Sequence, residues 1–180
     1  HAKPNIRKFD DKKLNKDEKL LVISEQGLGD TLQFMRYIPL IRKEGIDVSF
    51  CAQTKLHSLI RTSGIDYNPL TSYEVNKVIE GQWIPLISLL KYLKVNPKNP
   101  IINNPYIFST DEFVNKWNNI LKQEESLIIG INWQGNPISE KGSQKGRSFP
   151  LESFSIIAKN RDFKFVSLQK GFGSEQVESC

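Results

Sequence analysis

The residues best placed to do chemistry fall in two polar clusters, each of which directly follows an apolar run. The first cluster, Glu25–Asp30, places two glycines and an aspartate ahead of an amphipathic stretch. Glycines let the backbone approach a ligand closely, and a helix that begins here offers unpaired N–H groups. The simpler alternative is a tight strand-to-helix turn capped by Asp30. Spacing alone leaves both interpretations open.

The glycines Gly27 and Gly29 do not make a dinucleotide-binding fingerprint. The G-x-G-x-x-G pattern requires a third glycine at the position that Leu32 occupies. Asp30 would also bring a negative charge towards a pyrophosphate. We therefore reject a nicotinamide or flavin site at this turn.

The second cluster covers residues 130–150. It leaves an apolar run, crosses a polar loop that carries Lys141, Lys145 and Arg147, and leads into a further amphipathic segment. Cations beside a helix N-terminus can form a phosphate cradle. The alternative is a solvated loop whose lysines extend into water and bind no ligand. Trp133 has two interpretations as well, either a ligand contact or a large ring that covers the edge of the sheet.

Other polar residues give weaker signals. His57 has no acidic residue placed near it by sequence, and we expect it on the surface because a single histidine is no triad. No spacing of His, Cys, Asp or Glu predicts a metal site. Two cysteines, Cys51 and Cys180, make no disulfide framework, which favours a reducing, cytoplasmic compartment.

Apolar runs alternate with amphipathic stretches along the chain. We expect strands at residues 19–25, 46–51, 127–132 and 163–168, with a further short strand at Trp83. Helices are expected from Leu32 to Ile41 with an interruption at Pro39, and at residues 54–61 and 151–160. This alternation predicts an α/β protein with a Rossmann-like parallel sheet flanked by helices. Ligands then bind at the carboxyl ends of the strands, where both polar clusters lie.

One more helix is expected after the Pro- and Asn-rich residues 96–105. Ser109 and Glu112 have the spacing of a capping box, and the apolar residues Phe113 and Trp117 are expected on the core face of the helix.

Charge and hydropathy exclude two classes of partner. The net charge is +5, but residues 1–19 alone hold seven Lys or Arg against four Asp or Glu. The basic character therefore belongs to a polar lead-in, and no basic stripe with interleaved aromatics indicates nucleic-acid binding. The sequence contains neither a signal peptide nor an apolar run of membrane-spanning length, so we expect no membrane span.

Several of these segments together resemble a known glycosyltransferase family. Residues 20–40, 84–89, 129–137, 147–151 and 166–171 resemble, in the same order, segments of the glycosyltransferase domain found behind tetratricopeptide repeats in many bacterial proteins. That domain is similar to the heptosyltransferases of lipopolysaccharide synthesis. The resemblance implies a GT-B fold, in which an acceptor-binding and a donor-binding Rossmann-like domain face each other across a cleft.

The resemblance also implies roles for particular residues. Asp30 matches the proposed general base, which takes the proton of the acceptor hydroxyl. Acceptor contacts are expected from its neighbours Gln26, Gly27, Leu28, Gly29 and Gln33. Donor and phosphate contacts are expected in the second cluster and beyond it, from Trp133, Gln134, Gly135, Arg147, Ser148, Gln169 and Lys170. Arg147 stands where relatives carry a phosphate-binding lysine.

The expected organisation is a lead-in at 1–18, an acceptor-side domain at 19–108, a connecting helix at 109–126 and the start of a donor-side domain at 127–180. The family's later donor motif has no counterpart, so we expect a portion of a larger enzyme that is inactive alone and able to self-associate through the incomplete second domain. The expected activity is metal-independent, inverting transfer from a nucleotide sugar to a hydroxyl of a glycan or protein, with no cofactor. The alternatives are a non-catalytic glycan- or protein-binding module with the same fold and a generic nucleotide-binding protein.

Overall fold

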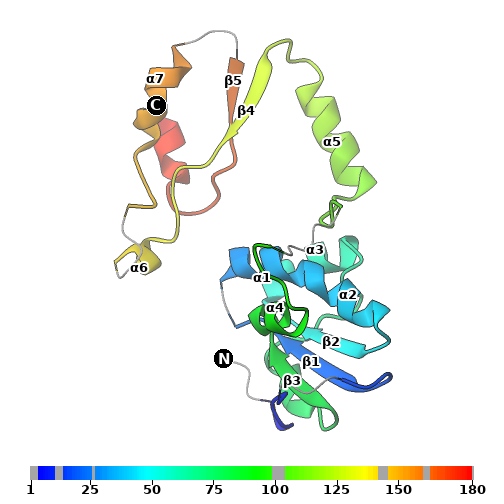
Figure 1. Ribbon diagram of the computed structural model, residues 1–180. Coiled ribbons are helices and arrows are strands. Elements are labelled where there is room, and N and C mark those ends of the chain that lie inside the picture. Colours follow the sequence, from blue (N-terminus) through cyan, green and yellow to red (C-terminus); the bar gives the residue numbers. More distant parts are fainter. Residues whose placement is uncertain are drawn as a thin grey trace. The chain divides into compact units, whose positions relative to one another are not determined.

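The computed structural model describes residues 4–10, 14–25, 27–98, 104–141, 146–159 and 163–179. The chain forms two compact units, residues 1–114 and residues 115–180 (Figure 1). The boundary between them falls inside helix α5 (Asp111–Leu121). Both units are built from parallel strands and short helices, as the alternating sequence pattern predicts.

The first unit contains a three-stranded parallel sheet in the order β2-β1-β3. Its strands are β1 (Lys19–Ile23), β2 (Asp47–Cys51) and β3 (Gln82–Pro85). Val22 in the central strand lies opposite Phe50 and Ile84 in its two neighbours. The last four residues of β1 are all buried, which explains why this strand is an unbroken apolar run.

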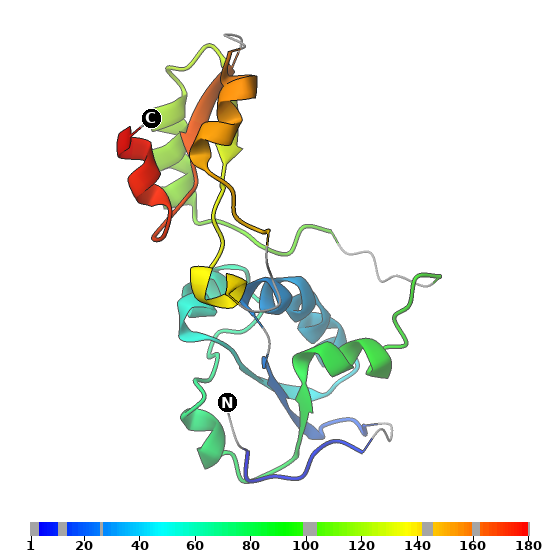
Figure 2. The same cartoon turned by 90° about the vertical axis from the view of Figure 1, so that its left-hand side faces the viewer.

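One face of this sheet carries the main hydrophobic core. Leu20 and Val22 pack there against the helical elements, which Figures 1 and 2 show along one side of the strands. These elements are α1 (Leu28–Phe34), η1 (Met35–Tyr37), α2 (Ile38–Lys43), η2 (Thr54–Leu56), α3 (His57–Thr62), η4 (Leu86–Ser88) and α4 (Leu89–Tyr92).

The opposite face is covered more thinly. Leu21 and Ile23 share a smaller cluster there with Cys51 and Val75, and Val75 belongs to the single turn η3 (Glu74–Lys77). No α-helix among the described residues contributes to this cluster. The covering is therefore incomplete near the carboxyl ends of the strands, where a cavity lies.

The predicted lead-in belongs to the fold of the first unit. Phe9 and Leu14 are buried, and Lys8 forms an isolated parallel bridge with Trp83. The backbone N–H of Phe9 donates to the carbonyl of Trp83 at 2.8 Å. This contact shields the outer edge of β3 from pairing with another chain.

The predicted helix between Leu32 and Ile41 is interrupted, as Pro39 indicates. α1 ends at Phe34, a 3-10 turn follows, and α2 begins at Ile38 with Pro39 in its first turn. A proline is tolerated there because the first N–H groups of a helix have no partner within it. Gly45, with φ of 84°, follows the end of α2.

His57 is buried rather than on the surface, so that prediction is wrong. Its side chain retains 6% exposure, and its Nε2 lies 3.1 Å from the carbonyl oxygen of Ala52. The imidazole packs back on the segment that leads out of β2. A contact of this kind needs no acidic neighbour, and spacing along the sequence does not reveal it.

The second unit contains two parallel strands, β4 (Leu127–Ile131) and β5 (Phe163–Ser167). Its short helices are α6 (Pro137–Glu140), η5 (Leu151–Phe154), α7 (Ser155–Ala158) and η6 (Ser174–Ser179). The strand expected at 127–132 is present as β4, but its apolar run is not buried throughout, because Leu127 is 68% exposed and only Ile131 is buried. Two strands alone cannot enclose each other's side chains.

α5 begins one residue later than the capping box requires. Thr110 precedes the helix, and its Oγ1 accepts the backbone N–H of Phe113 at 3.3 Å. Thr110 and not Ser109 is therefore the cap. The expected core face is also wrong as stated, since Phe113 and Trp117 remain half exposed. In the part of the chain that the structure describes, no helix has the length and apolar character needed to cross a membrane.

Candidate functional site

The Glu25–Asp30 cluster forms the entry to α1. The helix begins at Leu28, so Leu28, Gly29 and Asp30 are helical rather than part of the predicted turn. Oδ2 of Asp30 accepts the backbone N–H of Gly27 at 3.1 Å. The carboxylate thus stabilises the start of the helix from its third position, whereas Gly27 rather than Asp30 is the N-cap. The catalytic role of Asp30 stays a prediction.

The predicted acceptor contacts occupy an exposed surface around this entry. Gly27, Leu28, Gly29, Asp30 and Gln33 are all exposed. Gln26, which we also predict as a contact, lies outside the described residues. A narrow crevice lined by Asp30, Glu25 and Leu86 is too small to admit a water molecule.

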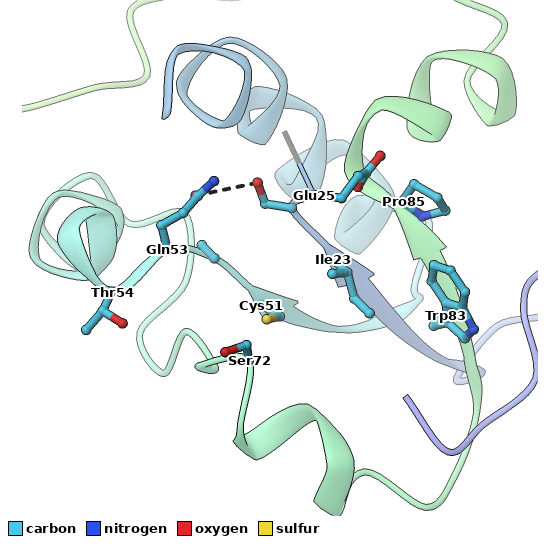
Figure 3. A pocket seen from close by; sticks show the side chains of 10 residues that line it. Ile23, Glu25, Cys51, Gln53, Thr54, Ser72, Trp83 and Pro85 are labelled. Carbon is cyan, nitrogen blue, oxygen red and sulfur yellow. Dashed lines mark hydrogen bonds between the residues drawn. The ribbon is translucent and has the colours of Figure 1, made fainter. Parts of the chain in front are cut away.

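A cavity of about 480 Å³ lies at the carboxyl ends of β1, β2 and β3. We call it the strand-end cavity (Figure 3). Its apolar lining comes from the strands and their ends, namely Ile23, Cys51, Ala52, Trp83 and Pro85. Its polar lining comes from the segments beyond the strands, namely Ser24, Glu25, Gln53, Thr54 and Ser72. This volume and this mixture are typical of a site for a small polar molecule.

The loop at residues 70–72 closes the cavity on the side of β2. Leu70 forms an isolated bridge with Cys51, and its N–H donates to the carbonyl of Phe50 at 2.7 Å. Ser72 follows directly and lines the cavity. In Figure 3, Gln53, Thr54 and Ser72 lie on one side of the cavity, with Trp83 and Pro85 across from them.

A hydroxyl network holds the polar wall in place. Oγ1 of Thr31 donates to Oε1 of Gln53 at 2.9 Å, and Oγ of Ser24 lies 3.5 Å from the same oxygen. Ser24 and Thr31 also share a hydrogen bond. The network joins the end of β1, helix α1 and the end of β2, so Gln53 is fixed from two sides.

The charges at the strand-end cavity are mostly acidic. Burial raises the pKa of the Glu25 carboxyl, while its own backbone N–H, that of Leu86 and the charge of Lys8 oppose the rise. Oε2 of Glu25 is buried without a hydrogen-bond partner. Burial also raises the pKa of the Cys51 thiol to about 11, with a smaller contribution from Glu74. Cys51 is therefore a neutral, apolar part of the floor at physiological pH.

The second cluster is brought together within the second unit. Oε1 of Gln169 accepts the backbone N–H groups of Trp133 and Gln134 at 3.2 and 3.0 Å. Nε2 of Gln169 donates to the carbonyl of Gln134 at 3.1 Å. Three of the predicted donor contacts thus bind one another across the ends of β4 and β5.

Ser148 joins the same group. Its Oγ accepts the N–H of Gly135 at 2.9 Å and donates to Oε1 of Glu140 at 2.6 Å. Arg147 and Lys170 are exposed beside these residues in the sequence, and Lys145 lies outside the described residues. A phosphate at Ser148 would have to displace the carboxylate of Glu140.

Trp133 is a buried structural residue in this unit. It retains 1% exposure, and its Nε1 donates to the carbonyl of Gly173 at 3.1 Å. The ring packs inside the unit rather than over an exposed sheet edge, and its predicted ligand contact stays a prediction. Trp133 also lines an apolar cavity of about 320 Å³, together with Phe154 and Phe165.

Sequence reasoning did not single out most of the strand-end cavity. The sequence pattern marks Glu25 only as the start of the glycine turn, and it predicts no contact from Gln53, Thr54 or Ser72. Glu25 and Gln53 each follow a strand closely, and that position was an available signal. Ser72 had no such signal, because its place depends on the path of a loop.

No protein-family model matches the chain, and no curated protein or solved structure matches it. Within the described residues, no group of three or more His, Cys, Asp or Glu side chains is arranged to hold a metal ion.

Proposed function

We propose that this chain is the acceptor-side portion of a glycosyltransferase, and that the strand-end cavity holds the acceptor sugar. The observation that carries the proposal is the position and lining of this cavity. It lies at the carboxyl ends of three parallel strands, where open α/β sheets bind ligands. The resemblance of residues 20–40 to the glycosyltransferase family supports the same assignment.

The lining suits a sugar ring. A sugar presents hydroxyl groups around its edge and C–H groups on its faces. Side chains of Gln53, Thr54 and Ser72 supply hydrogen-bonding groups, while Ile23 and Trp83 supply apolar surface for the C–H face. The Ser24–Thr31 network preorganises Gln53, which reduces the ordering that binding requires.

The proposed reaction is a single displacement with a nucleotide-sugar donor. The acceptor oxygen attacks the anomeric carbon, and the bond from that carbon to the nucleoside diphosphate breaks with its electron pair on the departing phosphate. The hydroxyl proton passes to a carboxylate, and attack from the opposite side inverts the configuration. Asp30 is the proposed base from the resemblance, and the reaction needs no metal or further cofactor in this scheme.

A non-catalytic glycan-binding module is the second candidate. One observation favours it: Asp30 does not line the strand-end cavity, and its carboxylate is engaged with the N–H of Gly27. Transfer assays of the wild-type protein separate the two functions, because a binding module shows no turnover, and Asp30→Asn then tests the base. A base role predicts a fall in turnover of about 100-fold or more, whereas unchanged turnover would remove Asp30 from the reaction.

Binding can be tested with the chain itself. We expect methyl glycosides of common hexoses to shift the backbone amide resonances of Ser24, Gln53 and Ser72 in ¹H–¹⁵N correlation spectra. The expected dissociation constant is on the order of 1 mM, since a single sugar offers few contacts. If every glycoside of the panel left all three resonances unmoved, the acceptor assignment would be wrong.

A further inference from the structure

We infer that the strand-end cavity selects a neutral, unphosphorylated sugar and rejects sugar phosphates. This inference rests on the proposed function, because it names the class of acceptor that the same cavity takes. It is carried by the charges around the cavity, which differ from those of a phosphate site.

The described lining residues of the cavity include no Lys or Arg. A phosphate that leaves water needs cationic or N–H donors to replace its hydration, and its burial is strongly unfavourable without them. The hydroxyl and amide groups of Gln53, Thr54 and Ser72 suit neutral hydroxyls, but they supply no positive charge.

The charged group that does line the cavity is an acid. Glu25 follows β1 directly, and the crevice beside it is shared with a second carboxylate, that of Asp30. Glu74 adds a third negative charge near the floor, where it acts on Cys51. Its Oε2 is held by the N–H and the hydroxyl of Thr71, both at 2.8 Å.

The cation whose charge acts on Glu25, Lys8, is already engaged with an aromatic ring. Nζ of Lys8 lies 5.4 Å from the centre of the Trp83 ring, in a cation–π contact. Lys8 does not line the cavity, and of the causes that act on the pKa of Glu25 its charge has the smallest effect. The one charged side chain in the described lining is therefore the carboxylate of Glu25, which opposes an anionic ligand.

The experiment compares matched ligands on the whole chain at pH 7. Glucose, glucose 1-phosphate, glucose 6-phosphate and inorganic phosphate are titrated while the amides of Gln53 and Ser72 are followed. We expect both sugar phosphates to bind about tenfold more weakly than glucose, because the carboxylate of Glu25 repels the phosphate at short range. In Glu25→Gln, which keeps the size of the side chain, this ratio should fall to about threefold.

The outcomes separate the inference from the function on which it rests. Sugar phosphates that bind as tightly as glucose, or a ratio that Glu25→Gln leaves unchanged, would overturn the inference and leave the acceptor site standing. Inorganic phosphate that shifts the amide resonances of Gln53 and Ser72 would also overturn the inference. Failure of all three sugars to bind would remove the proposed function, and the inference with it.

Discussion

Oγ1 of Thr31 donates a hydrogen bond to Oε1 of Gln53 at 2.9 Å, and this contact joins α1 to the carboxyl end of β2. Thr31 is fully buried, and the same hydroxyl lies 3.2 Å from the carbonyl oxygen of Gly27 at the helix entry. The orientation of Gln53 in the wall of the strand-end cavity thus depends on a residue that does not line it. Helix entry and cavity are parts of one hydrogen-bonded assembly.

Thr31→Val removes this hydroxyl and keeps the shape of the side chain. We expect the free energy of unfolding to fall by about 1 kcal/mol, because Gln53 loses a buried partner. Glucose affinity should fall about threefold, since the amide group is no longer held in position. Urea denaturation and NMR titration measure the two effects. Thr62→Val, at an exposed position on α3, is the control, and it should change neither quantity. An unaltered affinity in Thr31→Val would mean that Gln53 needs no positioning.

Glu25→Gln should alter the pH dependence of stability. Burial raises the pKa of this carboxyl above its ordinary value of 4.5, so the folded chain binds more protons there than the unfolded chain. The contribution of Glu25 to stability is therefore present at low pH and is lost as pH rises from 4.5 through the raised pKa. We expect wild type to lose stability relative to Glu25→Gln over this interval. Parallel stability curves for the two proteins would contradict the burial of Glu25.

Two glycines offer a matched test of how closely β1 and β3 approach each other. Gly81, with φ of 88°, precedes β3, and a Cβ there would lie 2.3 Å from the backbone oxygen of Lys19. Gly64, with φ of 65°, has open space around it. We expect Gly64→Ala to lower the free energy of unfolding by about 1 kcal/mol from backbone strain alone. Gly81→Ala should lower it by about 3 kcal/mol or more, because the clash adds to the strain. Equal losses in urea denaturation would show that β1 and β3 are not this close.

A second matched pair tests the interior of the second unit. Trp133→Phe removes the hydrogen bond from Nε1 to the carbonyl of Gly173 and leaves a gap in a buried position. We expect a loss of about 2 to 3 kcal/mol. Trp117→Phe, on the half-exposed face of α5, should cost less than about 1 kcal/mol. The two losses are compared from the midpoints of chemical denaturation. A larger loss in Trp117→Phe than in Trp133→Phe would place Trp133 at the surface.

The sequence predicted the central strand of the parallel sheet well because this strand is uniformly apolar after its first residue. Residues 20–23 are apolar without interruption, and such a run is typical of a strand that is buried on both faces. Pro39 likewise marked the interruption between α1 and α2, since a proline tolerates few positions in a helix.

The misplaced features depend on local backbone geometry that residue type alone does not reveal. Ser109 and Thr110 both qualify as caps by residue type, and only the start of α5 at Asp111 decides between them. His57 is buried because its ring folds back on Ala52, which its neighbours in the sequence do not indicate.

The sequence does not predict the strand-end cavity, because the cavity depends on a contact between segments that lie apart in the sequence. Its existence requires the loop at Leu70 to run beside the end of β2 and to leave the second face of the sheet partly uncovered. The glycine turn next to it is the stronger sequence signal, and it favours Asp30 over Glu25 and Gln53 as a candidate.

The most direct test of the acceptor site is the measurement of intermolecular nuclear Overhauser effects between a bound methyl hexoside and the chain. The account predicts contacts from the C–H protons of the sugar to the methyl groups of Ile23 and the ring protons of Trp83, both in the lining of the strand-end cavity. Contacts that appear only at other residues, while the sugar is demonstrably bound, would contradict it.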